Sequence, residues 1–224
     1  MRALNLSSAL VRARLIYILG LLYLLVGYLG TNEFAAINPW GRPALPIATE
    51  FDHALPFVPW TVIFYVMYYP LLLTPLFFSR SAESLNRLSL GQAAMNTISY
   101  LIFVLFPTPI DRPHAVPVEG VFHFVLDLLF RADHPYNTFP SLHVGQTCIL
   151  ALFYLRYSAD WVFSTPGASV SKNRAGLAVV VFHALSSFLV AASAVLIKQH
   201  YLADVFAGAL LAYTMSLIFF PRRT

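Results

Sequence analysis

The sequence predicts an all-α integral membrane protein that crosses the bilayer six times. Hydrophobic residues make up 58% of its 224 residues, charged residues only 11%, and the mean hydropathy is +0.69. Soluble domains carry about 25% charged residues, so 14 basic and 10 acidic side chains are too few to solvate this much apolar surface. Several apolar stretches also approach or exceed the roughly 18 residues that span a bilayer.

The six expected membrane helices cover residues 15–29, 56–78, 88–106, 142–157, 177–197 and 202–220. The first follows Arg2, Arg12 and Arg14, as the apolar part of a secretory signal would, but no small-residue cleavage pattern follows it closely. We therefore interpret it as a signal anchor. The sequence contains no internal repeat and no low-complexity tract, so we expect residues 1–224 to form one membrane-embedded domain.

A shorter apolar segment, HFVLDLLFR at residues 123–131, precedes the fourth expected span. His123, Asp127 and Arg131 follow one another at intervals of four residues and give the segment one polar stripe. The segment is too short to cross the bilayer, and we expect an interfacial helix along the outer leaflet. The stripe fits either a solvated face or a site where His123 or Arg131 contacts a lipid head group.

The distribution of Lys and Arg predicts the orientation. With six spans, ten basic residues fall on the side of the two termini, and only Arg42, Arg112, Arg131 and Lys198 fall on the other. Cytoplasmic loops are richer in Lys and Arg than the loops on the other side, so we expect both termini to lie in the cytoplasm. We expect the membrane to be the inner or plasma membrane of the cell. The basic residues form no clustered face, which excludes nucleic acid as the expected partner. The single cysteine, Cys148, lies in an apolar run, where we expect it to pack.

Histidines collect on the predicted outer side, where six of the seven lie in loops or at the boundary of a span. His143, within NTFPSLHVGQ, begins the fourth expected span, and His200, within IKQHYLADVFAG, begins the sixth. His200 and Asp204 are four residues apart and share one helix face, so the carboxylate can accept the imidazole N–H and fix its tautomer. An acid just inside a membrane span is expensive and by default indicates a functional site.

Two imidazoles, one carboxylate and the cations Arg112 and Lys198 at one membrane depth suit phosphoryl transfer. One imidazole would attack phosphorus to form a phosphohistidine, the other would protonate the leaving oxygen, and the cations would neutralise the phosphoryl oxygens. This chemistry requires no metal and no other cofactor. Two other hypotheses remain open, namely a b-type haem protein with two histidine ligands and a non-catalytic lipid transporter or carrier.

Three segments resemble the signatures of the type-2 phosphatidic acid phosphatase superfamily, and they are DRP (111–113), PSLH (140–143) and HYLAD (200–204). The resemblance covers roughly residues 106–208. It implies six membrane helices, an active site at the extracytoplasmic face, and a lipid phosphate or phospholipid as the substrate.

The same resemblance assigns roles to individual residues. It implies that His200 is the nucleophile, that Asp204 orients it, and that His143 is the general acid. It also implies that Arg112 and Ser141, with neighbouring backbone N–H groups, bind the phosphate oxygens.

The chain departs from these signatures at three positions. Leu105, Leu142 and Ala194 stand where the superfamily has Lys, Gly and Arg, respectively. Lys198 is our candidate substitute for the missing phosphate-binding cations, and Asn137, shortly before the second signature, is a candidate head-group contact.

Three further stretches resemble most closely the inositol phosphorylceramide synthase branch, and they are FPSLH, KQHY and EFDHALPFVPW (residues 50–60). Enzymes of that branch transfer a phosphorylated head group from one lipid to another. The sequence leaves open which lipid is the substrate, whether water or a lipid hydroxyl is the acceptor, and what the oligomeric state is.

Overall fold

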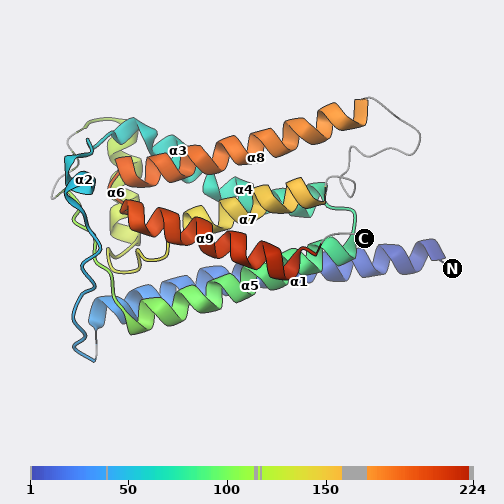
Figure 1. The fold of residues 1–224 in the computed structure, drawn as a ribbon, viewed down its shortest axis with the longest axis horizontal. Helices are drawn as coiled ribbons and strands as arrows, with labels where there is room; N and C mark the ends of the chain where they lie inside the picture. Colours follow the sequence, from blue (N-terminus) through green and yellow to red (C-terminus); the bar gives the residue numbers. More distant parts are fainter. Residues whose placement is uncertain (1, 39, 114–115, 117, 158–170, 222–224) are drawn as a thin grey trace.

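The computed structural model describes residues 2–38, 40–113, 116, 118–157 and 171–221, and its regular elements in these ranges are helices (Figure 1). One isolated β-bridge pairs Thr108 with Asn137. The helices, in chain order, are α1 (Arg2–Ile37), α2 (Glu50–Ala54), η1 (Pro59–Thr61), α3 (Val62–Val66), α4 (Tyr68–Phe78), α5 (Ala82–Leu105), α6 (Val121–Ala132), α7 (Leu142–Arg156), α8 (Ser171–Leu196) and α9 (Leu202–Phe219).

The long helices identify a multi-span integral membrane protein. Within the described residues, five helical segments are long and apolar enough to cross a bilayer, and they are Ser8–Ile37, Pro59–Phe78, Ala82–Leu105, Gly176–Leu196 and Leu202–Phe219. Large apolar side chains on their outer faces remain exposed, among them Leu22 at 51%, Phe188 at 68% and Leu210 at 65%. So much exposed apolar surface requires a lipid environment.

The fourth expected span, α7, differs from the other five. It has 15 residues, which at about 1.5 Å per residue is roughly 22 Å and less than the ~30 Å hydrocarbon core. It packs against both α8 and α9 and buries Ile149, Leu150 and Phe153 completely. Two hydrogen bonds between side-chain amides join it to α5. Gln92 donates to Gln146 at 2.7 Å, and Gln146 donates to Asn96 at 2.6 Å.

The second expected span is interrupted rather than continuous. It is divided into η1, α3 and α4, and α3 ends at Val66. Pro70 lacks an N–H group, and its ring interferes with the carbonyl four residues earlier, which is that of Val66. The break places Tyr65 and Tyr68 on either side of it, where both contact the candidate site.

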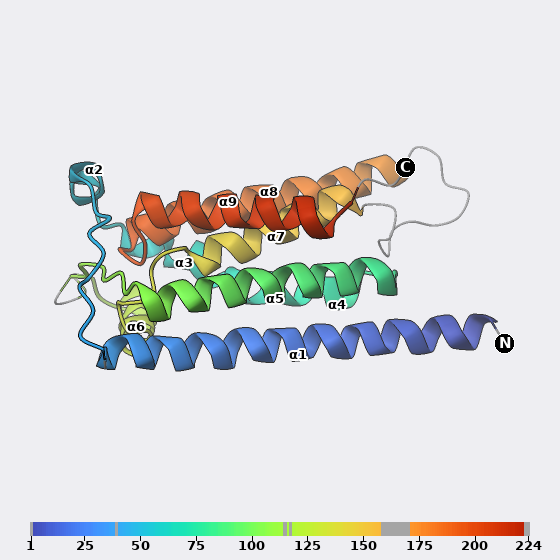
Figure 2. The same ribbon diagram turned by 60° about the horizontal axis from the view of Figure 1, so that its bottom comes forward.

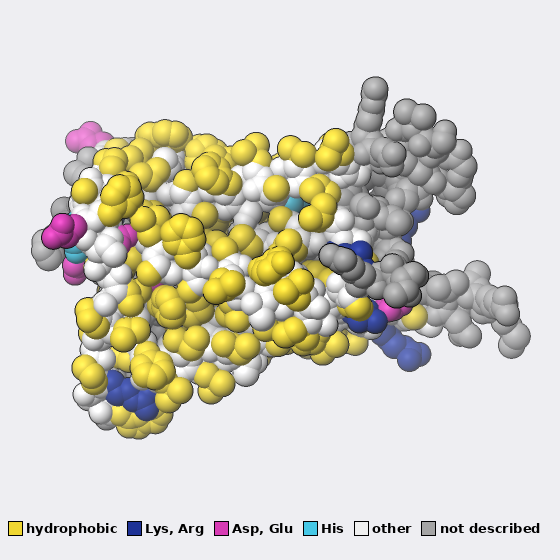
Figure 3. All heavy atoms as spheres, viewed as in Figure 1, with side chains coloured by type: hydrophobic (Ala, Val, Ile, Leu, Met, Phe, Trp, Pro, Cys, Tyr) yellow, Lys and Arg dark blue, Asp and Glu magenta, His cyan; other side chains and the backbone are white. Residues whose placement is uncertain are grey.

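The helices run along the long axis of the molecule, with α6 across one end (Figures 1 and 2). The start of α1 and the end of α9 both lie toward the opposite end of the bundle, although they are apart from each other (Figures 1 and 2). In the space-filling view, hydrophobic side chains cover the surface between the ends, and charged side chains concentrate at the two ends (Figure 3). Cys148 is partly buried, and its sulfur lies 3.1 Å from the Ser187 hydroxyl.

Glycines allow α7 and α9 to approach closely where each helix begins. A Cβ on Gly208 would lie only 2.3 Å from the carbonyl oxygen of Ser141, and one on Gly145 would lie 3.3 Å from the carbonyl oxygen of Gly208. Beside this contact, the N–H of Ser141 donates to the carbonyl oxygen of Asp204 at 3.0 Å. The crossing therefore holds the first turns of the two helices side by side.

Candidate active site

His143 and His200 meet at the end of the bundle that carries α6. Their ring centroids are 5.8 Å apart, and the two residues are only 8% and 5% exposed. His143 lies in the first turn of α7, and His200 lies two residues before α9. The close crossing of the two helices brings together histidines that are far apart in the sequence.

The turn that carries His200 is a helix C-cap. Lys198 takes a left-handed conformation with φ of 56°, its N–H donates to the Val195 carbonyl, and the N–H of Gln199 donates to the Ala194 carbonyl. This pair of bonds is a Schellman motif, in which the left-handed position is usually glycine. The N–H of His200 also donates to the Ala194 carbonyl, at 3.0 Å, so the end of α8 holds the backbone of the histidine.

The hydrogen bonds of His200 determine which ring nitrogen is free. Its Nδ1 lies 3.0 Å from the carbonyl oxygen of Thr138 and 3.3 Å from Oδ2 of Asp204. A carbonyl and a carboxylate can only accept, so we assign the proton to Nδ1. Nε2 then carries a lone pair, which is the form required of a nucleophile.

Asp204 connects this histidine to the start of α9. Its Oδ2 also accepts the backbone N–H of Tyr201 at 2.8 Å, which caps the first turn of the helix. A carboxylate in the first turn is stabilised by the positive end of the helix dipole. Asp204 is completely buried, and its Oδ1 has no hydrogen-bond partner among the described residues.

His143 lies among tyrosine rings. Its Nδ1 is 3.0 Å from the hydroxyl of Tyr65, and its ring centroid is 4.4 Å from that of Tyr65 and 4.5 Å from that of Tyr68. A hydroxyl can donate to a neutral imidazole or accept from an imidazolium. Tyr65 can therefore hold the ring in one orientation both when His143 is protonated and when it is neutral.

Arg112 reaches the site because two loops run side by side. The N–H of Thr108 donates to the carbonyl of Tyr136, and that of Ile110 donates to the carbonyl of Pro135. The guanidinium of Arg112 then bonds the carbonyl of Asp133 at 2.5 Å and its carboxylate at 3.4 Å.

Two other bonds tie Arg112 and its neighbour to the turn of His200. Arg112 Nη2 donates to Oε1 of Gln199 at 2.6 Å, and the N–H of Asp111 donates to the Tyr201 hydroxyl at 3.1 Å. The side chain of Arg112 is 9% exposed. The segments with DRP, PSLH and HYLAD thus form one connected cluster.

Ser141 and Lys198 are both engaged in local structure. Ser141 is the N-cap of α7, and its hydroxyl accepts the N–H of Val144 at 3.3 Å. The ammonium of Lys198 donates to the carbonyls of Asp52 and Leu55 at 2.9 and 2.8 Å, at the end of α2. Burial lowers the pKa of Lys198, and the charge of Asp52 opposes this shift.

Asp52 completes the contact between α2 and the turn of His200. Its Oδ1 accepts the N–H of Leu202, the first residue of α9, at 2.8 Å, and its Oδ2 accepts the N–H of Thr49 at 2.9 Å. The stretch at residues 50–60 therefore supports the cluster from outside.

The three candidate head-group residues are not brought to the histidines. Arg131 is exposed and pairs with Asp127 at 2.9 Å along α6. His123 is exposed on the same helix, beside a shallow hollow that includes Glu119. Asn137 is buried, and its amide donates to the Thr31 hydroxyl of α1 at 3.1 Å.

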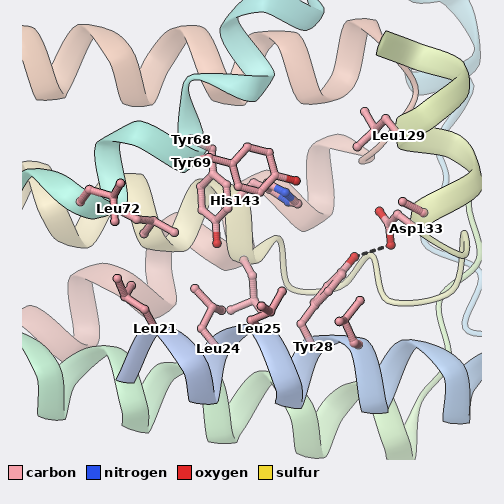
Figure 4. Close-up of a pocket in the computed structure, with 14 residues that line it drawn as sticks. Leu21, Leu24, Leu25, Tyr28, Tyr68, Tyr69, Leu72, Leu129, Asp133 and His143 are labelled. Atoms are coloured by element: carbon pink, nitrogen blue, oxygen red, sulfur yellow. Dashed lines mark hydrogen bonds between the residues drawn. The ribbon is translucent and has the colours of Figure 1, made fainter. Parts of the chain in front are cut away.

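His143 is one of the residues that line an apolar cavity of about 510 Å³ (Figure 4). Figure 4 shows leucines of α1 on one side, Tyr68, Tyr69 and Leu72 of α4 on the other, and His143 beside the tyrosine rings. At its polar end Tyr28 donates to Asp133 at 2.5 Å. His143 lines this cavity, whereas His200 does not.

Several residues that contact the histidines or Arg112 were not predicted from the sequence, among them Tyr65, Thr138 and Gln199. Thr138 contacts His200 through its backbone carbonyl, which every residue has, so the residue type at this position could not indicate the contact. Gln199 could have been flagged as a polar group at the outer boundary of a span, and Tyr65 as a hydroxyl within one. Their contacts depend on packing between distant segments.

Comparisons with known proteins bear on the second half of the chain. Residues 87–223 match the model of the PAP2 superfamily, which is more than half of the sequence. No curated protein and no solved structure is significantly similar to the chain.

Proposed function

Because the chain belongs to the PAP2 superfamily, we propose that it is a membrane lipid phosphatase or phosphotransferase that works through a phosphohistidine. Membership itself implies a metal-independent phosphatase or phosphotransferase that acts on phosphate esters. The lipid substrate and the roles of individual residues are our proposal, and they rest on the geometry of the cluster.

In the first step, the Nε2 lone pair of His200 attacks phosphorus. An N–P bond forms as the bond from phosphorus to the leaving oxygen breaks, and protonated His143 gives its proton to that oxygen. Asp204 and the Thr138 carbonyl hold the Nδ1 proton and stabilise the positive charge that develops on His200. Arg112 and backbone N–H groups near Ser141 offset the charge on the phosphoryl oxygens.

In the second step, the oxygen of water or of a lipid hydroxyl attacks the phosphohistidine. Its proton passes to His143, the N–P bond breaks, and the electron pair returns to Nε2 of His200. Free phosphate is the product with water, and a new phospholipid is the product with a lipid alcohol.

The observation that carries the proposal is the pair of acceptors on Nδ1 of His200. In the neutral imidazole they hold the proton on Nδ1, so Nε2 carries the lone pair, in a residue that is 5% exposed and whose ring lies 5.8 Å from that of a second buried histidine. One unprotonated and one protonatable imidazole at this separation are what an in-line transfer between nucleophile and leaving group requires.

The apolar cavity supports a lipid substrate. Its volume of about 510 Å³ lies in the range of roughly 300–1,000 Å³ typical of ligand sites. Leucines and tyrosines of α1 and α4 line it together with His143, the proposed proton donor. A hydrocarbon chain in this cavity would place the leaving or accepting oxygen at His143 and the phosphoryl group between the two histidines.

We also propose six spans, with α7 as the fourth, both termini in the cytoplasm and the site at the extracytoplasmic face. Support comes from the location of the start of α1 and the end of α9 toward the end of the bundle opposite α6 (Figure 1). A lipid hydroxyl as acceptor, as in the inositol phosphorylceramide synthase branch, is the finer proposal, and it rests on the sequence resemblance alone.

The test is to incubate the protein purified in detergent with a panel of lipid phosphates and phosphodiesters, with and without lipid alcohols. We expect release of phosphate or formation of a new phospholipid, and we expect His200→Ala and His143→Ala each to abolish it. Full activity in His200→Ala would rule out the mechanism. Lipid movement without turnover by the wild type would favour a carrier instead.

A further inference from the structure

The amide of Gln199 has an orientation that its neighbour determines. Its oxygen accepts from Nη2 of Arg112 at 2.6 Å. A guanidinium has donors only, so the atom bonded to it must be the amide oxygen and cannot be the nitrogen. The NH₂ group of Gln199 therefore points away from that bond, and its two N–H donors remain for another partner.

No described residue accepts from this NH₂ group. Gln199 is 1% exposed, and its Nε2 has no hydrogen-bond partner among the described residues. Nε of Arg112 is likewise buried without a partner in the described part of the chain. A buried donor without an acceptor destabilises a protein, because the hydrogen bonds that it made to water are not replaced. Gln199 and Arg112 are hydrogen-bonded to each other, and each has one such donor. Because Gln199 is next to His200, these donors indicate that a ligand with acceptor atoms binds beside this histidine.

A phosphoryl group matches these donors. It has several acceptor oxygens and a negative charge, which the Arg112 guanidinium complements. The expected cations are not free for this role, since Ala194 stands at one position and the Lys198 ammonium donates to two carbonyls of α2.

We propose that the NH₂ group of Gln199 donates a hydrogen bond to a nonbridging phosphoryl oxygen of the substrate, next to Arg112. This role rests on the proposed function of the same site. It makes Gln199 a phosphate-binding residue that contacts the transferred group, and Arg112 both a phosphate ligand and the group that orients the amide.

Two substitutions separate this role from that of a support for Arg112. Gln199→Glu retains an oxygen for Nη2 of Arg112 but removes the NH₂ donors, whereas Gln199→Met removes both. If the amide only positioned Arg112, Gln199→Glu would retain activity and only Gln199→Met would lose it. If the amide binds phosphate, both lose it, and Gln199→Glu also places a negative charge beside the phosphoryl oxygens.

The experiment measures binding of orthovanadate, a phosphate mimic, by calorimetry on the detergent-purified wild type and both variants, and kcat/KM on the best phosphoester substrate. We expect each variant to bind vanadate at least about 10-fold more weakly and to lose about 10²-fold in kcat/KM, the effect of removing one transition-state donor. The unfolding temperature of each variant should stay within a few degrees of the wild type.

Wild-type vanadate binding in Gln199→Glu would overturn the inference, as would a wild type that does not bind vanadate. A wild type that binds vanadate through Gln199 but cleaves no phosphoester would contradict the proposed function and leave the phosphate site standing. If Gln199→Glu unfolds, Gln199→Met gives the same vanadate measurement, and unchanged binding in it would likewise overturn the inference.

Discussion

The carbonyl oxygen of Ser141 occupies the space where a side chain on Gly208 would begin, since a Cβ there would approach it to 2.3 Å. This contact sets the distance between the first turns of α7 and α9, and thereby between the two histidines. Backbone atoms form it, so it cannot relax by rotation of a side chain.

Gly208→Ala should therefore separate the histidines. Overpacking of this kind destabilises a protein by about 1–3 kcal/mol, and we expect a lower unfolding temperature in detergent and a loss of activity of at least about 10-fold. Gly30→Ala is the matched control, because no atom lies within 4 Å of its added Cβ. Equal behaviour of the two variants would show that the close crossing is not required.

Asp204→Asn should reduce activity less than the corresponding Asp→Asn substitution does in the catalytic triad of a serine protease. There the substitution reduces kcat by about 10⁴-fold because the histidine takes the wrong tautomer. Here the Thr138 carbonyl, at 3.0 Å, continues to accept the Nδ1 proton of His200. We expect a loss of about 10- to 10²-fold, since charge stabilisation is lost but the tautomer is kept. A measured loss near 10⁴-fold would mean that Asp204 alone determines the tautomer.

Asp52 makes stability depend on pH in the acid range. Burial alone would raise the pKa of Asp52, but hydrogen bonds from Thr49 and from the N–H of Leu202 outweigh it and lower the pKa. A carboxylate with a lowered folded pKa contributes stability that is complete above its unfolded value, near 3.9, and is lost as the pH falls through the folded value.

Asp52→Asn should accordingly lower the unfolding temperature at pH 7 by about 2–4 °C, which for a chain of this size corresponds to roughly 1 kcal/mol. The difference from the wild type should begin to shrink as the pH falls to the unfolded value near 3.9, and it should close only below the lowered folded pKa, where the wild-type carboxylate is itself protonated. Asp127→Asn is the control, because its ion pair with Arg131 is exposed and of little weight. A difference that persists unchanged into acid would exclude the charge of Asp52 as its cause.

The apolar cavity should govern the use of lipid substrates but not of small ones. Leu25→Trp, on the side of α1 that lines the cavity, should raise KM for a long-chain lipid phosphate by about 10-fold or more through lost apolar contact. It should leave a short water-soluble phosphoester nearly unaffected. Leu22→Trp, an exposed position on the same helix outside the cavity, should change neither. Equal effects of the two substitutions on the KM for the lipid would mean that its hydrocarbon chain binds outside this cavity.

Much of this arrangement could be predicted from the sequence. Long apolar runs predict five of the membrane helices because length and composition alone decide whether a helix can cross a bilayer. The spacing of His200 and Asp204 predicts their contact, but His200 lies two residues before α9 and reaches a carboxylate in its first turn, instead of sharing one helix face with it.

Other features depend on contacts between distant segments, which a single sequence does not reveal. The amide of Gln199 reaches Arg112 across 87 residues, and Tyr65 reaches His143 across 78. Lys198 shows this most clearly. Its nearness to His200 in the sequence suggests a phosphate ligand. In the structure its backbone is left-handed, and its ammonium donates to the carbonyl of Asp52 in α2. A helix C-cap at a lysine lacks the glycine that would have signalled it.

The measurement that tests the central claim most directly is the trapping of the phosphorylated protein. After brief incubation with a ³²P-labelled lipid phosphate, we predict an acid-labile, alkali-stable label on His200. It should be absent in His200→Ala and should accumulate in His143→Ala when the leaving group needs no protonation, because the second step then lacks its base. Turnover of the lipid with no label on His200, or with a label on another residue, would contradict the account.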